Sequence, residues 1–269
     1  MEIVLKNVNY SYKNKKLLDK ISLTIESNKI TGIIGDNKSI LCEIIDDIKD
    51  FNSGEITLDK VEYNKENLKT IRNKVAMIKQ NSADQFFTSN PKEEIMFLIS
   101  RLDYKPKDIN KKIDQALEIV GLSNDILNKD LEALTVGQKK LFQIAISLIY
   151  NPDVIIFDEA FVALDRTNKK KIIKLIKELK NKYKKTIIIS SNNYNLLYEI
   201  TDNIIILKKS HVLISGKTSD IYQNITFLKE NKIDIPNLVK FTMLAKDKKV
   251  KLSYHQDILD LIKDVYKHV

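Results

Sequence analysis

The sequence is poor in glycine, has a single cysteine and contains no long apolar run. It has 6 glycines among 269 residues, about a third of the usual ~7 %, and its reliance on Lys, Asn and Ile indicates coding bias toward A/T-rich codons. The single cysteine, Cys42, excludes an internal disulfide and fits a reducing cytosol. No apolar stretch approaches the ~18 residues needed to span a bilayer, and residues 1–6 lead into a predicted strand rather than a signal peptide. Any membrane association is therefore expected to be peripheral and to depend on partners.

Basic residues outnumber acidic ones by 45 to 36, which gives a formal net charge of +9. Such an excess suits nucleic acid or the anionic inner face of a membrane. The densest lysine cluster, residues 169–185, interleaves its lysines with Ile172, Ile176 and Leu179 at helical spacing. This pattern is typical of a solvated helix face rather than of a binding stripe, so charge alone identifies no partner.

Apolar periodicity predicts a β-rich start followed by an α/β core. Residues 1–30 alternate apolar and polar side chains, which suggests an antiparallel edge sheet. A strand, a loop and a helix begin at residue 30, and residues 53–55, Ser-Gly-Glu, predict a turn that leads into a strand. Residues from about 82 to 150 read as mostly helical.

The second half of the chain alternates strands with helices. Strands are predicted at 154–158, 186–190 and 203–207, with helices between them. This alternation implies a parallel sheet. A chain of 269 residues has room for one substantial core plus a small appended domain.

Residues 32–39, Gly-Ile-Ile-Gly-Asp-Asn-Lys-Ser, read as a phosphate-binding loop that has lost its middle. A complete loop runs Gly, four residues, Gly-Lys-Ser/Thr. Its backbone N–H groups wrap the phosphates, while the lysine and the hydroxyl reach phosphate and Mg²⁺. Three residues, two of them glycine, must be inserted between Asn37 and Lys38 to restore the usual pattern, so N–H donors and a close approach of the backbone are lost. Taken alone, the stretch is more simply an ordinary strand-turn-helix.

The apolar run at 154–157 ends in two carboxylates, Asp158 and Glu159. Such a run is typical of a strand buried on both faces of a parallel sheet, and its end lies at the crevice where open α/β sheets bind ligands. In nucleotide hydrolases the first acid holds Mg²⁺ through water and the second polarises the attacking water. The alternative is that these polar residues merely terminate the strand.

Residues 134–138, Leu-Thr-Val-Gly-Gln, stand at the head of a long amphipathic segment. The hydroxyl of Thr135 can cap a helix, and a helix N-terminus also attracts phosphate. With these pieces in this order, the chain resembles the ATP-binding cassette (ABC) ATPases over most of its length.

The resemblance implies roles for several residues. Tyr12, in the stretch Tyr-Ser-Tyr at 10–12, is similar to the ring that stacks on adenine. Residues 134–138 occupy the place of the signature motif Leu-Ser-Gly-Gly-Gln, which binds the γ-phosphate of the nucleotide held by the partner subunit. Gln80 matches the glutamine that senses the nucleotide and faces the membrane partner, and Asn192 lies where the family has its switch histidine.

The resemblance implies a nucleotide site for MgATP. The candidate nucleotide-binding residues are Tyr12, Gly35, Asp36, Asn37, Lys38, Ser39, Ile40, Leu134, Thr135, Val136, Gly137, Gln138, Asp158 and Asp165. The candidate catalytic residues are Glu159, Asn192 and Gln80, and Mg²⁺ brought with ATP is expected at Ser39, Gln80 and Asp158. No other metal site is expected, because the histidines at 211, 255 and 268 have no ligand spacing.

Two further stretches are similar to one branch of the family. Residues 80–87, Gln-Asn-Ser-Ala-Asp-Gln-Phe-Phe, resemble the Gln-Asn-Pro-Asp-x-Gln-Phe of energy-coupling-factor (ECF) and cobalt/nickel-type importer ATPases. The tail from Gly216 resembles the small C-terminal domain through which paired ECF ATPases contact each other.

The departures from the family pattern concentrate in the nucleotide site. The phosphate loop is short, Ile40 replaces the Thr after Ser39, and Ala160 replaces the proline after the glutamate. Asn192 lacks the charge and the two-nitrogen geometry of histidine, and Val136 puts a branched side chain where bare backbone is usual. The chain's own site is therefore expected to be worse damaged than the signature it lends, although Glu159, the expected general base, is present.

The sequence predicts an α/β, P-loop NTPase-like ABC nucleotide-binding domain with a parallel core sheet, an antiparallel edge sheet and a helical subdomain. The expected domains are 1–215, with the helical subdomain at about 82–150, and a C-terminal dimerisation domain at 216–269. We expect an ATP-binding subunit of an ECF-type importer of a vitamin or metal ion, peripheral on the cytosolic face of the membrane. Its expected partners are a second ABC ATPase subunit, with a heterodimer preferred, and a transmembrane coupling protein with a substrate-binding membrane subunit.

Three alternatives stand beside this interpretation. The first is a non-hydrolysing scaffold or regulatory ABC protein without a transport role, against which residues 80–87 and the tail argue. The second is a nucleic-acid-associated ABC protein, which only the net charge favours, so no nucleic-acid partner is expected. The third is that the short loop is a sequence error, in which case Asn192 and Val136 alone would be expected to impair catalysis.

Overall fold

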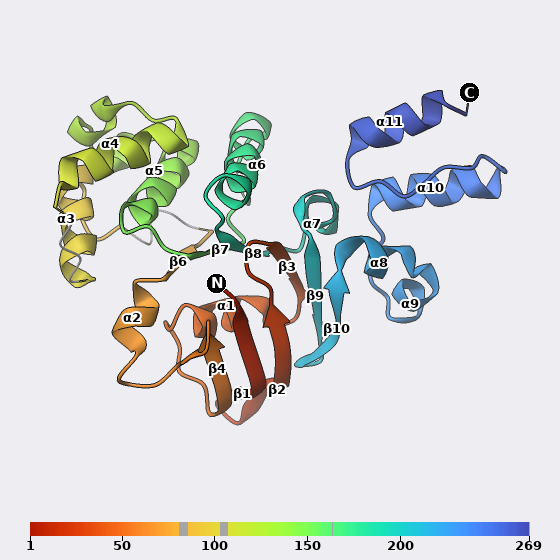
Figure 1. Cartoon of the computed structure of the whole chain (residues 1–269), viewed down its shortest axis with the longest axis horizontal. Helices are drawn as coiled ribbons and strands as arrows, with labels where there is room; N and C mark the ends of the chain where they lie inside the picture. Colours follow the sequence, from red (N-terminus) through yellow and green to blue (C-terminus); the bar gives the residue numbers. More distant parts are fainter. Residues whose placement is uncertain (81–85, 103–106, 163, 269) are drawn as a thin grey trace.

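The computed structural model describes residues 1–80, 86–102, 107–162 and 164–268. Two sheets form its centre, and helices lie around them (Figure 1). One sheet has four strands in the order β2-β1-β4-β5, and the other has six in the order β10-β9-β3-β8-β7-β6. The four-stranded sheet is antiparallel, as the alternation at the start of the chain predicts. Its strands are β1 Ile3–Tyr12, β2 Lys15–Ile25, β4 Ser53–Leu58 and β5 Val61–Glu62.

The six-stranded sheet is parallel except at its β10 edge. Its strands are β3 Ile30–Gly35, β6 Val75–Ile78, β7 Val154–Asp158, β8 Thr186–Ser190, β9 Asn203–Lys208 and β10 His211–Lys217. Strands β7, β8 and β9 confirm the three strands expected in the second half of the chain. The P-loop-like α/β fold class is thereby confirmed.

Helices connect the strands and form two lateral groups (Figure 1). The connecting helices are α1 Lys38–Ile45, α2 Leu68–Arg72, α6 Arg166–Asn181 and α7 Tyr194–Ile200. The first lateral group, which we call the helical arm, contains α3 Pro91–Arg101, α4 Ile109–Val120, the 3₁₀ turns η2 Asn124–Asn128 and η3 Leu131–Ala133, and α5 Val136–Ile149. The second group, the C-terminal helices, contains α8 Thr218–Gln223, α9 Ile225–Glu230, α10 Asn237–Asp247 and α11 Ile258–Tyr266.

One expected turn is in fact strand. Residues 53–55 already belong to β4, which pairs with β1 at a register irregularity between Lys6 and Asn9. Gly54 has φ +106°, and a Cβ there would lie 2.6 Å from the carbonyl oxygen of Asn7. The glycine therefore marks a close approach of two strands at a bulge rather than a chain reversal.

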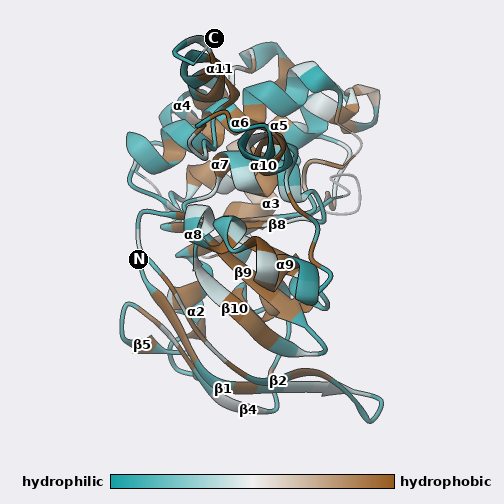
Figure 2. Cartoon of the chain, turned by 90° about the vertical axis from the view of Figure 1, so that its right-hand side faces the viewer, coloured by the Kyte–Doolittle hydropathy of each residue, from teal (hydrophilic) through white to brown (hydrophobic). Residues whose placement is uncertain are grey.

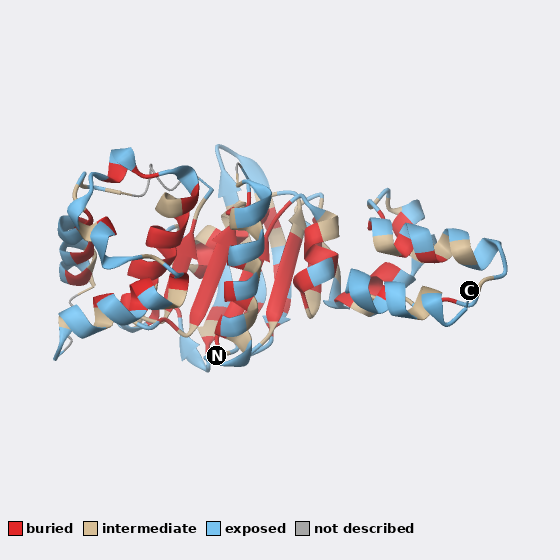
Figure 3. Ribbon diagram, turned by 90° about the horizontal axis from the view of Figure 1, so that it is seen from above, coloured by how far each residue is buried: buried red, intermediate tan, exposed pale blue. Residues whose placement is uncertain are grey.

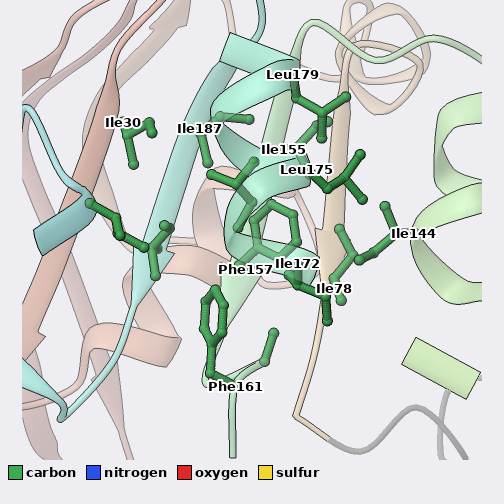
Figure 4. Packing of buried hydrophobic residues seen from close by; sticks show 14 of the residues in the cluster. Ile30, Ile78, Ile144, Ile155, Phe157, Phe161, Ile172, Leu175, Leu179 and Ile187 are labelled. Atoms are coloured by element: carbon green, nitrogen blue, oxygen red, sulfur yellow. The ribbon is translucent and has the colours of Figure 1, made fainter. Parts of the chain in front are cut away.

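The core has two layers. One lies between the two sheets around α1, and the other joins the parallel sheet to the arm, α6 and α7. In Figure 4, Ile155 and Phe157 of β7 pack with Leu175 and Leu179 of α6. The lysines of α6 lie opposite this apolar face, as the sequence predicts for a solvated helix. Figure 3 shows the central strands largely buried. Because β8 pairs in parallel with both β3 and β7, the carboxyl ends of these three strands lie at one edge of the sheet.

The C-terminal helices carry an uncovered apolar face. Six of their large apolar side chains are exposed in the described chain: Phe241, Leu244, Ile258, Leu259, Ile262 and Tyr266. Figure 2 shows the apolar colouring of α11 at this end of the molecule.

The expected boundary between the two domains, after residue 215, falls inside strand β10. The division of the chain into these two domains stays a prediction. Among the described residues, no helix is both long enough and apolar enough to cross a membrane.

Candidate functional site: a shortened nucleotide site

The phosphate loop is reduced to a two-residue turn. Strand β3 ends at Gly35 and helix α1 begins at Lys38. Gly35 has φ +108°, and a Cβ there would overlap the carbonyl oxygen of Leu207 on β9, so only glycine fits. Asn37 has φ 57°, a left-handed conformation that asparagine tolerates better than most residues. The turn of Asp36 and Asn37 therefore connects the strand to the helix without the glycine-rich residues of a complete phosphate loop.

Both side chains of this turn are tied to neighbouring loops. The Asp36 carboxylate accepts a hydrogen bond of 3.0 Å from the backbone N–H of Lys209. The Asn37 amide donates one of 2.8 Å to the carbonyl oxygen of Leu17 on β2. No side chain caps α1, so the N–H groups of its first turn remain available to an anion. The structure thus keeps the helix N-terminus of a phosphate site but lacks the loop that normally surrounds the phosphates.

Lys38 is bound within the chain. Its ammonium donates a hydrogen bond of 2.9 Å to Oδ1 of Asn192 and lies 3.0 Å from Oε1 of Glu159. The Lys38 and Glu159 side chains are only 10 % and 16 % exposed, so water screens this ion pair weakly. The residue expected to hold phosphate, the expected general base and the residue at the switch position are therefore brought together, and they bind one another.

Ser39 and Asp158 also meet. The Ser39 hydroxyl donates a 2.8 Å hydrogen bond to Oδ1 of Asp158, and the Ser190 hydroxyl donates to the same oxygen. Parallel pairing explains this meeting, because Asp158 at the end of β7 is in register with Ser190 at the end of β8. Hydroxyl and carboxylate oxygens are the ligands that Mg²⁺ prefers. This donor set fits Mg²⁺ held with a bound nucleotide. No group of three His, Cys, Asp or Glu side chains that could hold a metal alone occurs in the described part of the chain.

A cavity of about 870 Å³ extends from this site to the helical arm. Ser39, Asp158 and Glu159 line one end of it, Gln80 lies along it, and Phe97 of α3 lines the arm side. Gln80, which follows β6, thus lines a cavity that reaches both the nucleotide site and the arm. Its sensing role stays a prediction. The residues at 81–85 of the stretch that resembles the ECF branch lie outside the described residues.

Burial changes the acidity of one carboxyl in this cavity. Asp46, just after α1, lines the cavity beyond the nucleotide site. Burial raises its pKa to about 7, against the opposing effect of the nearby Lys79 ammonium. Around neutral pH this carboxyl exchanges between its neutral and charged forms.

The signature segment is built quite differently from the phosphate loop. Thr135 is the N-cap of α5, and its hydroxyl accepts from the backbone N–H of Gln138 at 3.2 Å. The Gln138 side chain accepts in turn from the backbone N–H of Thr135 at 3.0 Å, which completes a capping box. Val136 is 56 % exposed. Leu134 is buried beneath this turn, so the helix start is fixed while its outer surface stays uncovered.

The remaining candidate residues lie around these two centres. Tyr12 is exposed at the tip of the β1–β2 hairpin, with the Lys13 ammonium 5.4 Å from its ring centroid. Asp165 caps α6 by accepting from the backbone N–H of Asn168 at 2.9 Å and from its side-chain amide at 2.5 Å. These hydrogen bonds hold the pKa of Asp165 below its usual value, and the bond from the backbone N–H of Asn168 has the largest effect. Ile40 lies in the first turn of α1. Nucleotide contacts of Tyr12, Ile40 and Asp165 stay predictions.

Sequence reasoning missed three buried charges, Lys140, Glu94 and Lys185. Lys185 was expected on a solvated face, but it is buried, and its ammonium donates a 2.7 Å hydrogen bond to Oδ1 of Asn151. A signal was present for Lys140 and Glu94. On α5 the buried residues include Gly137, Lys140, Leu141 and Ile144, and on α3 they include Pro91, Glu94, Ile95 and Ile99. Each charge therefore occupies a position of the apolar stripe.

Residues 18–162 match the family described as ABC transporter. The chain belongs to the ABC transporter family. It is 32 % identical over 245 residues to the energy-coupling factor transporter ATP-binding protein EcfA1 of Mycoplasmopsis pulmonis, covering 89 % of this chain and 92 % of that protein. It is 29 % identical over 265 residues to EcfA of Malacoplasma penetrans, covering 96 % and 92 %.

A solved structure of the same family agrees with these relatives. The structure of cbiO1 from Clostridium perfringens, described as part of the ABC transporter complex cbiONQ, aligns with a TM-score of 0.74 and 25 % identity. The alignment covers 90 % of this chain and 98 % of that one. The resemblance to ABC transporter ATP-binding subunits of the energy-coupling factor type is confirmed.

Proposed function

We propose that this chain is the ATP-binding subunit of an ECF-type importer, with its own nucleotide site impaired and its signature segment completing a partner's site. The observation that carries the proposal is that Lys38 is bound to Glu159 and Asn192, whereas Val136 at the start of α5 is uncovered. The polar groups of the nucleotide site are paired inside the chain, whereas the Val136 side chain is exposed, although Asn168 of α6 lies against the neighbouring Gly137.

At its own site we expect weak MgATP binding and slow hydrolysis. Bound Mg²⁺ supplies charge neutralisation, and the oxygens of Ser39 and Asp158 are the groups that would hold it. To meet a phosphate, the Lys38 ammonium must leave Glu159, so part of the binding free energy is consumed in breaking that ion pair. The two-residue turn also presents fewer N–H donors than a complete loop. Glu159 keeps a carboxylate near the reacting end of the site, and Asn192 offers an amide in place of the histidine ring.

The second ABC ATPase subunit is expected to be a different chain with an intact phosphate loop. Thr135 to Gln138 would then close over its nucleotide. The exposed apolar face of α10 and α11 suits a contact with the same subunit, because burying Phe241, Leu244 and Leu259 would remove them from water.

The cavity beside the arm suits the membrane partner. Three exposed apolar side chains, Ile48, Phe87 and Phe97, line it. An apolar segment of a transmembrane coupling protein fits such a concave surface. A separate substrate-binding membrane subunit would choose the solute, a vitamin or metal ion. The chain would be held peripherally at the cytosolic face through these contacts.

The test is hydrolysis by a mixture of this chain and a partner subunit with an intact loop. Hydrolysis should be lost with Gly137→Ala, and it should be indifferent to Glu159→Gln. Since a Cβ at Gly137 would overlap the Asn168 amide, a second signature variant, Val136→Asp, separates a lost contact from a local distortion. The opposite pattern, with Glu159→Gln inactive and both signature variants active, would contradict the proposal.

A second candidate is a non-hydrolysing regulatory ABC protein with no role in transport. The pairing of Lys38 with Glu159 favours it, because both groups are withdrawn from catalysis. A pull-down from solubilised membranes separates the two candidates. Recovery of a transmembrane protein that depends on Phe87 supports the transport role, and recovery of the partner ATPase alone supports the regulatory one.

A further inference from the structure

Lys140 connects the signature helix to the end of β6. Its side chain is buried at 1 % exposure, and its ammonium donates to the carbonyl oxygen of Lys79 and, at 2.9 Å, to that of Gln80. A third acceptor, Oε1 of Gln143, lies 3.3 Å away. An ammonium has three protons to donate, and three acceptors receive them. Lys140 stands one helical turn beyond the start of α5, so it joins the signature segment to the backbone of Gln80.

Glu94 makes the complementary connection on α3. The side chain is buried at 3 % exposure, and its Oε2 accepts from the backbone N–H groups of Phe87 at 2.8 Å and Thr88 at 2.9 Å. The Thr88 hydroxyl donates to the same oxygen at 3.2 Å. No cation pairs with this carboxylate among the described residues. Its charge is therefore balanced by the N–H and O–H groups of one short stretch of chain.

The two contacts share a location. One charge holds Gln80 and the other holds Phe87 and Thr88, on either side of residues 81–85. Burying a single ammonium or carboxylate costs several kcal/mol unless its hydrogen bonds are made. Burial also lowers the Lys140 pKa to about 8. The hydrogen bonds to Gln80 and to Phe87 and Thr88 offset these costs, so each buried charge depends on its own connection.

We propose that Lys140 and Glu94 are positioning residues that fasten the helical arm to the chain at Gln80 and at Phe87–Thr88, so that the signature segment, Gln80 and Phe87 move as one body. The inference rests on the proposed function and deepens it. A displacement of Gln80 at the chain's own nucleotide site is then passed through Lys140 to the signature lent to the partner. Docking at Phe87 is passed through Glu94 to the same arm.

The chain offers a clean reporter, because it has no tryptophan. Phe87→Trp places one indole next to Phe97 of α3, at a residue that is 65 % exposed. In this background Lys140→Met removes the ammonium from α5, and Lys139→Met is its matched control on the same helix. Glu94→Leu removes the carboxylate from α3, and the exposed Glu93→Leu is its matched control.

Two readouts test the connection in the assembled pair of this chain and an intact partner. The first is the change in indole fluorescence on adding MgATP, which we expect to fall at least fivefold in Lys140→Met and to persist in Lys139→Met. The second is hydrogen exchange of the Phe87 and Thr88 amides, which we expect to become at least tenfold faster in Glu94→Leu and to stay unchanged in Glu93→Leu. Hydrolysis should fall in kcat in both test variants, with KM for ATP within twofold of wild type.

The outcomes separate the inference from the proposed function. If the wild-type mixture does not hydrolyse MgATP, the proposed function fails. If it does, and Lys140→Met and Glu94→Leu match their controls in fluorescence and exchange, the inference is overturned. If Lys140→Met or Glu94→Leu does not fold, the wild-type chain itself still provides a test. In the wild-type chain the Phe87 and Thr88 amides must exchange at least tenfold more slowly than in an unstructured peptide, and unprotected amides would overturn the proposal.

Discussion

The phosphate loop and the signature segment both begin a helix, yet they treat that helix end in opposite ways. At α1 no side chain caps the helix, and the side chains of the turn hold β2 and the β9–β10 turn. At α5 a capping box satisfies the helix start, and Val136 faces solvent. The turn before α1 is tied to its own chain by side-chain hydrogen bonds, whereas the start of α5 is held by its own capping box and leaves the Val136 side chain exposed. The contrast teaches that loss of the glycine loop is compatible with a signature segment that keeps its shape.

Restoring the loop should break this contrast most strongly. Insertion of Gly-Ser-Gly between Asn37 and Lys38 should tighten MgATP binding about 100-fold, since one added charge-assisted hydrogen bond contributes about 1.5–3 kcal/mol. Calorimetry on the purified chain measures this change, and Lys38→Ala in the restored chain should abolish the gain. The same insertion between Asp59 and Lys60, in the turn between β4 and β5, is the control. Unchanged affinity in the restored loop would show that the short turn is not what limits binding.

A carboxylate placed at Val136 tests whether the signature segment meets the partner's nucleotide. The fold should tolerate this charge, because the Val136 side chain is exposed. Val136→Asp should lower hydrolysis in the mixture with an intact partner about 30-fold, because a carboxylate facing a phosphate costs roughly 2 kcal/mol or more. Steady-state hydrolysis and the thermal midpoint are measured together. Val61→Asp, at another exposed valine, on β5, is the control. Equal activity of the two variants would show that the partner's nucleotide does not meet α5.

The buried ammonium of Lys140, which joins the signature helix to the backbone of Gln80, predicts a pH dependence of stability. Burial lowers its pKa from the usual 10.5 to about 8, so the unfolded chain binds more protons between these values and stability rises with pH there. The destabilising charge is fully present below about pH 8 and is relieved above it. From pH 7 to 9 the wild type should gain about 1.4 kcal/mol of unfolding free energy relative to Lys140→Met. Urea unfolding of both proteins measures the difference, and a constant difference would contradict the prediction.

The capping box should give the smallest effect. Thr135→Ala removes the acceptor for the Gln138 N–H and should cost about 1 kcal/mol of unfolding free energy. Thr135→Ser keeps the hydroxyl and should lie within a few tenths of a kcal/mol of wild type. Thr226→Ala, on the exposed side of α9, is the control. If Thr135→Ala and Thr226→Ala unfold alike, the rigidity of this helix start does not come from its cap.

Much of the site could be predicted because parallel strands end at a common edge. The strands at 154–158 and 186–190 were expected within their observed bounds, and the first places Asp158 where Ser39 can reach it. The turn expected at 53–55 was wrong, because Gly54 serves a close strand approach that is set by a distant partner, Asn7.

The charged contacts could not be predicted from sequence in the same way. The pairing of Lys38 with Glu159 depends on how far a shortened turn brings α1 toward β7, and spacing along the chain does not give that distance. Lys140 and Glu94 look like surface residues by type, since lone charges rarely enter a core. Only their positions on apolar stripes indicate burial, and their acceptors and donors come from a segment remote in sequence.

The uncovered apolar face of α10 and α11 has a consequence for the abundance of the protein in the cell. A copy that finds no partner displays Phe241, Leu244 and Leu259 to chaperones and proteases, which act on exposed apolar surface. We expect unassembled copies to be cleared faster than assembled ones, so the supply of partner subunits would set the number of surviving copies. The same face would then serve as a stoichiometry control, by which the cell matches this subunit to the assemblies that can use it.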